Sequence, residues 1–102
     1  MKKKYTYTPQ DAIWARRIRE LFPRCIFCSR LANIQAHHWF KPRGHAPLRL
    51  NIYNGVGLCG SCHKRIHKRA TGKDYILIAM AVALRHKLRS IETLVCKLEV
   101  GE

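Results

Sequence analysis

Four of the five cysteines form two Cys-x-x-Cys pairs, and their spacing restricts the possible folds more than any other feature of the sequence. Cys25 pairs with Cys28, and Cys59 pairs with Cys62, with thirty residues between the two pairs. Two such pairs in one chain are typical of four thiolates that enclose a zinc ion in a tetrahedron. Neither pair has the βαβ setting of a redox motif, and no secretory context favours disulfides. The cysteines therefore predict a structural Zn²⁺ site, which would reinforce the small core of a 102-residue chain.

A helix is expected before the first cysteine pair. Thr8 can cap it, Pro9 suits its first turn, and Asp11 places a carboxylate where it favours the helix dipole. These signals predict a helix over residues 8–22. The Gly and Pro residues that follow indicate hairpin strands and loops, and a short helix is then expected over 61–70.

A run free of Gly and Pro over residues 74–100 predicts a long helix, or one broken near Arg89 and Ser90. Its apolar seam advances in alternating steps of four and three, as in a coiled coil. We favour packing on the core over dimerisation, because further apolar residues widen the stripe. Cys96 lies in this helical pattern and is expected to be a buried apolar filler. The seam residues are Leu77, Ala81, Leu84, Leu88, Ile91, Val95 and Leu98.

The sequence carries a formal net charge of +14, with 20 Lys and Arg against 6 Asp and Glu. Residues 21–73 contain no acidic side chain, so half of the chain presents charge of one sign. Such a field attracts polyanions, which makes nucleic acid the expected partner and an anionic membrane a weaker alternative. The longest apolar run, 75–84, is too short to cross a bilayer, and the N-terminus lacks the apolar stretch of a signal peptide. The chain is therefore expected to be soluble and cytoplasmic, with no membrane partner.

Five of the six histidines lie between residues 37 and 67. His63 and His67 are four residues apart, so on a helix they share one face and lie near enough to bind one metal ion. The adjacent Cys62 would fix the start of that helix and so the direction of the pair. His37 and His38 would point to opposite faces of a strand, so that one of them can face a metal.

Four elements of the sequence form one pattern. In chain order they are Cys25-x-x-Cys28, Ala36-His37-His38, Asn54 and Leu58-Cys59-x-x-Cys62-His63-x-x-x-His67. This pattern resembles the HNH endonucleases, which have the ββα-metal fold, and among them the small zinc-stabilised members common in phages and prophages. The resemblance covers about residues 25–67. It implies an α+β fold in which a ββα-metal core over 25–72 lies between the N-terminal helix and the C-terminal helical segment. The whole chain, 1–102, would be a single nuclease domain.

The resemblance implies a role for each histidine of the motif. His38 would be the general base that activates water, which suits a side chain that accepts a proton near neutral pH. His37, His63 and His67 would be the ligands of the catalytic metal. Imidazole ligands favour transition ions over magnesium. The expected catalytic cofactor is therefore Mn²⁺, Ni²⁺ or Co²⁺, with activity at least equal to that with Mg²⁺.

The central asparagine of the motif corresponds to Asn54, nine residues before His63. The resemblance implies that Asn54 belongs to the catalytic machinery, where it braces the loop and orients the base histidine. Asn51 fits the motif less well, because it lies twelve residues before His63.

Double-stranded DNA is the substrate that the resemblance implies, held through its phosphates by basic residues of the hairpin turn and the short helix. One active site per chain would make a nick the product of a monomer, and a homodimer through the C-terminal helix could pair two nicks. A non-catalytic zinc-binding module for nucleic-acid recognition is the alternative, since it would use the same cysteines and charge. A role in assembly through the C-terminal helix is a third possibility. The expected DNA-binding residues are Arg43, Lys64, Arg65, Lys68 and Arg69.

Overall fold

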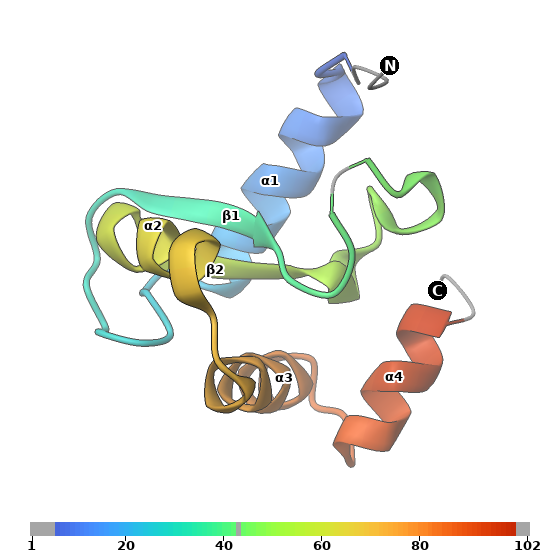
Figure 1. Ribbon diagram of the computed structural model, residues 1–102. Coiled ribbons are helices and arrows are strands. Elements are labelled where there is room, and N and C mark those ends of the chain that lie inside the picture. Colours follow the sequence, from blue (N-terminus) through green and yellow to red (C-terminus); the bar gives the residue numbers. More distant parts are fainter. Residues whose placement is uncertain (1–5, 43, 100–102) are drawn as a thin grey trace.

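The structure is a computed structural model that describes residues 6–42 and 44–99. Arg43 and residue 100, which belong to two of the predictions above, lie outside these residues. Within the described chain the fold is α+β, with four α-helices and one two-stranded sheet (Figure 1). The elements in chain order are α1 (Pro9–Leu21), β1 (Ile34–His38), the 3₁₀ helices η1 (Ala46–Leu48) and η2 (Ile52–Asn54), β2 (Gly55–Cys59), α2 (Gly60–Arg69), α3 (Gly72–Arg85) and α4 (Ile91–Glu99).

The N-terminal helix α1 begins where the sequence predicts. The hydroxyl of Thr8 accepts a hydrogen bond from the backbone N–H of Asp11, and the Asp11 carboxylate accepts one from the backbone N–H of Thr8. This reciprocal capping box satisfies donors that the first turn leaves without helical partners. Arg49, from the loop between the strands, donates from Nε to Asp11 Oδ1 at 2.8 Å and also pairs with Oδ2. One buried carboxylate thus starts the helix and ties it to a distant loop.

The two strands pair antiparallel, from Ile34 opposite Cys59 to His38 opposite Gly55. Helices α1 and α2 both pack on this sheet, and Figure 1 shows them on its opposite sides. Helix α2 continues directly from β2. The segment 34–69 therefore has the element order β–β–α that the sequence predicts for its core.

Two glycines of β2 allow α1 to approach the sheet closely. A Cβ added at Gly55 would lie 2.3 Å from Cδ1 of Ile18, and one added at Gly57 would lie 2.6 Å from Cβ of Phe22. Any side chain at these positions would push the helix away from the sheet. The glycines therefore set the distance between α1 and β2.

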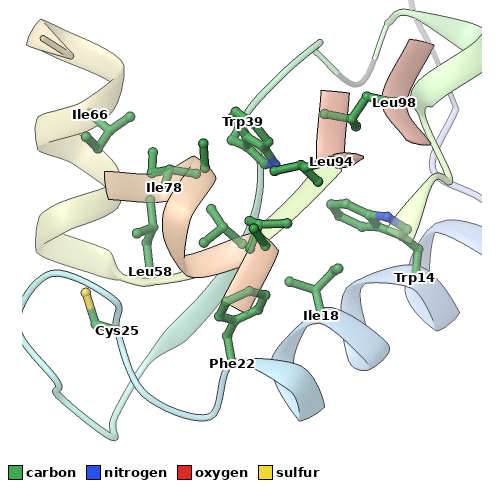
Figure 2. Close-up of a cluster of buried hydrophobic side chains, with 14 of the residues drawn as sticks. Trp14, Ile18, Phe22, Cys25, Trp39, Leu58, Ile66, Ile78, Leu94 and Leu98 are labelled. Atoms are coloured by element: carbon green, nitrogen blue, oxygen red, sulfur yellow. The ribbon is translucent and has the colours of Figure 1, made fainter. Parts of the chain in front are cut away.

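The hydrophobic core lies between the sheet, α1, one face of α2 and the two C-terminal helices (Figure 2). It joins side chains from both ends of the described chain, so the C-terminal segment is part of the fold and not an appendage. Burying one large aliphatic or aromatic side chain contributes about 1.5–3 kcal/mol. The largest fully buried apolar side chains are Ile18, Phe22, Val56, Leu58, Ile78, Val82, Leu94 and Leu98.

The C-terminal segment is broken, as one of the two sequence alternatives expects. Helix α3 ends in a Schellman motif, in which the backbone N–H of Leu88 donates to the carbonyl of Ala83 at 2.8 Å. Lys87 takes the left-handed conformation that this motif requires, with a φ of 57°. Ser90 then accepts a hydrogen bond from the N–H of Thr93 at the start of α4. These local bonds end one helix and begin another.

The break leaves part of the predicted seam in solvent. Leu77 and Leu84 are 52% and 80% exposed, whereas Ile78 and Val82, which lie beside the seam, are fully buried. Helix α3 is therefore apolar on two faces, and it packs on β2 and α4 through the face that widens the stripe. Even so, no helix in the described part of the chain is both long and apolar enough to cross a membrane.

The prediction that Cys96 is buried is wrong, because its side chain is exposed. Helix α4 buries Leu94 and Leu98 instead. These two residues share one helix face, and Cys96, midway between them, lies on the opposite face.

Asp11→Asn should lower the free energy of unfolding at neutral pH by about 2 kcal/mol, because it removes a buried charge-assisted bond to Arg49. The guanidinium of Arg49 holds the pKa of Asp11 well below its usual range. Since folding lowers this pKa, the stabilisation is present at neutral pH and disappears as the pH falls below about 4. Asp74→Asn is the matched control: it removes the corresponding capping carboxylate of α3, whose partner Arg65 is exposed, and should cost less. Urea unfolding followed by circular dichroism measures both, and equal decreases would contradict a stabilising role for Arg49.

Candidate metal centres

Four cysteines from two distant segments lie together. Cys25 and Cys28 belong to the turn before β1, Cys59 ends β2, and Cys62 lies in the first turn of α2. Their sulfur atoms all lie within 4.8 Å of one another, and Sγ of Cys28 is 3.6 Å from Sγ of Cys59. Sulfurs that bind one tetrahedral zinc ion at about 2.3 Å would lie about 3.8 Å apart. The prediction of a single four-cysteine cluster is confirmed, and its spacing is consistent with a structural zinc site.

The four thiols do not share one pKa. Burial acts to raise the pKa of Cys25, but hydrogen bonds from the backbone of neighbouring residues lower it to about 6. Burial and the sulfur of Cys59 raise the pKa of Cys62 to about 12. The protein alone therefore favours one thiolate and opposes another beside it. Four thiolates in this cluster require a divalent cation to offset their repulsion, which is the chemistry that zinc supplies.

A second cluster, of three histidines, joins β1 to α2. His37 faces α2 from the strand, and His63 and His67 lie one turn apart on the helix. Nε2 of His63 lies 3.1 Å from Nδ1 of His37 and 3.1 Å from Nε2 of His67. Two nitrogens that bind one tetrahedral ion at about 2.1 Å would lie about 3.4 Å apart. The structure thus brings the three imidazoles together at a spacing that fits a shared metal ion.

Two histidines of this cluster, the buried His37 and the half-buried His63, favour the neutral form. Burial, and then the neighbouring His63, lowers the pKa of His37 to about 4. Burial and His67 lower the pKa of His63 as well. Neutral imidazole is the form whose lone pair binds a metal. Among the described residues no carboxylate joins the cluster, so its donors are nitrogen atoms, which suit a divalent transition ion.

The direction in which His63 and His67 point follows from the start of α2 and from the face that this helix buries. Cys62 belongs to the sulfur cluster and directly precedes His63. Ile66 is 5% exposed and fixes the face of the helix that meets the core. His63 and His67 occupy the neighbouring face and therefore point toward β1.

Gln35 contacts this cluster, although the sequence does not single it out. It precedes His37 by two residues, so its side chain lies on the same face of β1. Its Oε1 lies 2.6 Å from Nδ1 of His63. The two-residue spacing on a strand is the only sequence signal for this contact, because an uncharged amide belongs to no metal motif.

His38 lies on the other face of β1, against α1. Its ring stacks on that of Trp14, with the centroids 4.0 Å apart and the planes inclined by 9°. Its Nε2 lies 2.9 Å from the carbonyl oxygen of Arg49. The two histidines of the doublet thus diverge, as the sequence expects. Trp14 is a neighbour that sequence reasoning misses, because the stack joins segments far apart in the chain.

Asn54 is completely buried and holds the loop between the strands. Its Oδ1 accepts hydrogen bonds from the backbone N–H groups of Phe40 and Lys41, at 2.8 and 3.0 Å. Its Nδ2 donates to the carbonyls of Lys41 and Leu48, at 2.8 and 3.0 Å. These four hydrogen bonds brace the loop. Asn51, the less fitting alternative, caps the short helix η2 instead.

The basic residues of α2 differ in their surroundings. Lys64, Lys68 and Arg69 are exposed. Lys64 and Lys68 each follow a cluster histidine by one position, so they border the histidine face. Arg65 is also exposed, but its guanidinium pairs with the carboxylate of Asp74 at 3.2 Å. The two lysines are therefore the cations best placed to meet a phosphate beside the histidines.

A scan against protein-family models found no match, and searches of the curated proteins and of the solved structures found no similar protein. The chemistry of this chain is therefore inferred from the two clusters and the residues around them.

The sulfur cluster should hold one zinc ion per chain that survives dialysis, and Cys28→Ser should release it and unfold. The reason is that the free energy of structural zinc binding, about 10 kcal/mol or more, is folding free energy in a domain this small. Cys96→Ser is the matched control, since this cysteine is exposed and lies outside the cluster. Zinc content by mass spectrometry and helicity by circular dichroism measure the effect. Zinc retained at the parental level in Cys28→Ser would contradict four-sulfur ligation.

Proposed function

We propose that the protein is a metal-dependent endonuclease of the HNH type that hydrolyses phosphodiester bonds in double-stranded DNA. The observation that carries this proposal is the convergence of three imidazole nitrogens on one side of β1. The adjacent histidine, His38, faces Trp14 on the other side of the strand. A pure nucleic-acid-binding module does not require that set of histidines. The net charge of +14 supports the same proposal, because it attracts a polyanionic substrate.

His37, His63 and His67 would hold the catalytic ion, through Nδ1 of the first residue and Nε2 of the other two. When bound there, a divalent ion supplies positive charge to the scissile phosphate and to the leaving oxygen. Since neutral imidazoles carry no charge of their own, these ligands leave the positive charge undiminished. Nitrogen donors also favour Mn²⁺, Ni²⁺ or Co²⁺ over Mg²⁺.

His38 is the proposed general base. A carbonyl oxygen only accepts hydrogen bonds, so the 2.9 Å contact with Arg49 places the ring proton on Nε2. Nδ1 then carries the lone pair that accepts a proton from water as water attacks phosphorus. The stack on Trp14 holds the plane of the ring while the carbonyl holds its tautomer. Trp14 and the carbonyl of Arg49, both distant from His38 in the chain, therefore help to orient this ring.

Asn54 is proposed as a positioning residue for this base. It donates a hydrogen bond to the carbonyl of Leu48, and the next carbonyl along the chain, that of Arg49, accepts from His38. Asn54 therefore acts on the base through the loop backbone. Lys64 and Lys68 would bind the DNA phosphates beside the histidine face, which positions the substrate without reading its sequence. One such site per chain makes a single-strand nick the expected product.

Supercoiled plasmid should be nicked by the protein in the presence of added Mn²⁺, Ni²⁺ or Co²⁺, and at least as fast as with Mg²⁺. His38→Ala should slow nicking by about 10²–10⁴-fold, the usual contribution of a general base. His45→Ala is the matched control, because this histidine is exposed and lies outside the cluster. Gel quantification of nicked and linear plasmid measures the rates.

Two results would go against the proposal. Parental nicking by His38→Ala would overturn the assignment of the base. Failure of the parent to nick with any of the four ions would overturn the endonuclease, and a gel shift without cleavage would then favour a zinc-binding recognition module.

Replacing Lys64 and Lys68 together by Ala should weaken DNA binding for all sequences alike, because both lysines are expected to bind phosphates. The slope of log affinity against log salt concentration should fall by about 2, one unit for each phosphate that the double variant no longer neutralises. Replacing Lys73 and Arg89, which are exposed outside α2, removes the same charge and is the control. Fluorescence anisotropy on a labelled duplex at several salt concentrations measures both. Equal changes in the slope would show that net charge alone, and not placement on α2, governs binding.

A further inference from the structure

Gln35 lies beside the histidine cluster. It is half-buried on β1, on the face that carries His37. Its Oε1 is 2.6 Å from Nδ1 of His63, a short contact for a neutral hydrogen bond. Among the described residues, no other contact reaches Nδ1 of His63. The second ring nitrogen of His63, Nε2, faces His37 and His67.

The Gln35 amide has a second partner, Asn33. Its Nε2 lies 3.4 Å from Oδ1 of Asn33, and an NH₂ group can only donate. This contact agrees with the orientation in which the amide oxygen faces His63. Gly60, at the start of α2, makes room for this arrangement, because a Cβ there would lie 2.5 Å from Nδ2 of Asn33 and 3.5 Å from Nε2 of Gln35.

An amide oxygen facing Nδ1 decides where the proton of His63 resides. The oxygen accepts only, so Nδ1 must carry the hydrogen and Nε2 must carry the lone pair. We infer that Gln35 is a positioning residue that holds His63 in the Nδ1–H tautomer and so directs its Nε2 lone pair into the centre of the His37–His63–His67 cluster. The inference rests on the metal-dependent function proposed above, in which these three residues are the ligands.

The effect on the metal follows from the general behaviour of ligating histidines. Such a histidine gives its second ring N–H to an acceptor, which fixes the ring and raises the basicity of the ligating nitrogen. Removal of that acceptor typically reduces metal affinity by about 10–100-fold. Gln35 supplies the acceptor without adding negative charge, so the three-nitrogen site keeps its neutral ligand set.

The inference is tested by metal binding and ring tautomer together, on full-length protein that carries one zinc ion per chain. Gln35→Ala should weaken Co²⁺ binding at the histidine cluster by about 10–100-fold, measured by competition with a chelating dye. Ring ¹⁵N–¹H spectra before Co²⁺ addition should show His63 as Nδ1–H in the parent and as a mixture of tautomers in Gln35→Ala. Gln35→Glu keeps an acceptor oxygen and should restore both readouts, and Gln10→Ala, on the exposed face of α1, should change neither.

The outcomes separate this inference from the nuclease proposal. Parental Co²⁺ affinity and a pure Nδ1–H tautomer in Gln35→Ala would overturn the role of Gln35, even if the parent nicks plasmid. Weaker Co²⁺ binding and a mixed tautomer in Gln35→Ala would uphold that role, even if the parent failed to nick. Failure of Gln35→Glu to restore both readouts would also overturn it, because the role requires only an acceptor at this position.

Discussion

The contact among four cysteine sulfurs is the constraint on which the rest of this small fold depends. It joins the turn before β1 to the junction between β2 and α2, two segments that are distant in the sequence. Because Cys62 directly precedes His63, the same contact fixes where the helix histidines begin. A core of this size is small, so a zinc ion held by the four sulfurs would stabilise the fold and orient the histidines at once.

Two of the few acidic residues in the chain act at helix ends. Of six in the sequence, Asp11 and Asp74 each begin a helix through a capping box and each also pair with an arginine from outside that helix. These two carboxylates are buried and organise helix ends. Asp74 pairs with Arg65 of α2, whereas Lys64, Lys68 and Arg69 of the same helix are exposed. Stability and a strongly positive surface are compatible here because these two carboxylates act at buried helix ends.

Features encoded by local spacing can be predicted from the sequence, whereas features that depend on contacts in the folded chain cannot. The cysteine spacing and the spacing of His63 and His67 place ligands on one turn or one helix face, and both clusters form. The apolar pattern of α3 did not reveal which of its two apolar faces is buried, since that depends on the sheet it meets. The burial of Cys96 is wrongly predicted for a similar reason, because the buried face of α4 depends on its contacts with α3 and η2. Gln35 and Trp14 were missed because each matters through a residue distant in sequence, and neither type of side chain marks a metal or a base.

The register in which β1 pairs with β2 decides which face of the sheet each histidine of the doublet occupies. Side chains alternate across a strand, so a shift of pairing by one residue would exchange His37 and His38 between the two faces of the sheet. The side chains of the doublet do not disfavour that exchange, because both residues are histidine. What distinguishes them is Cys59, which stands opposite Ile34 at one end of the ladder, and Gly55, which stands opposite His38 at the other. Which histidine joins the histidine cluster and which meets the tryptophan thus depends on the pairing register, and Cys59, at the end of β2 and within the four-cysteine cluster, fixes that register.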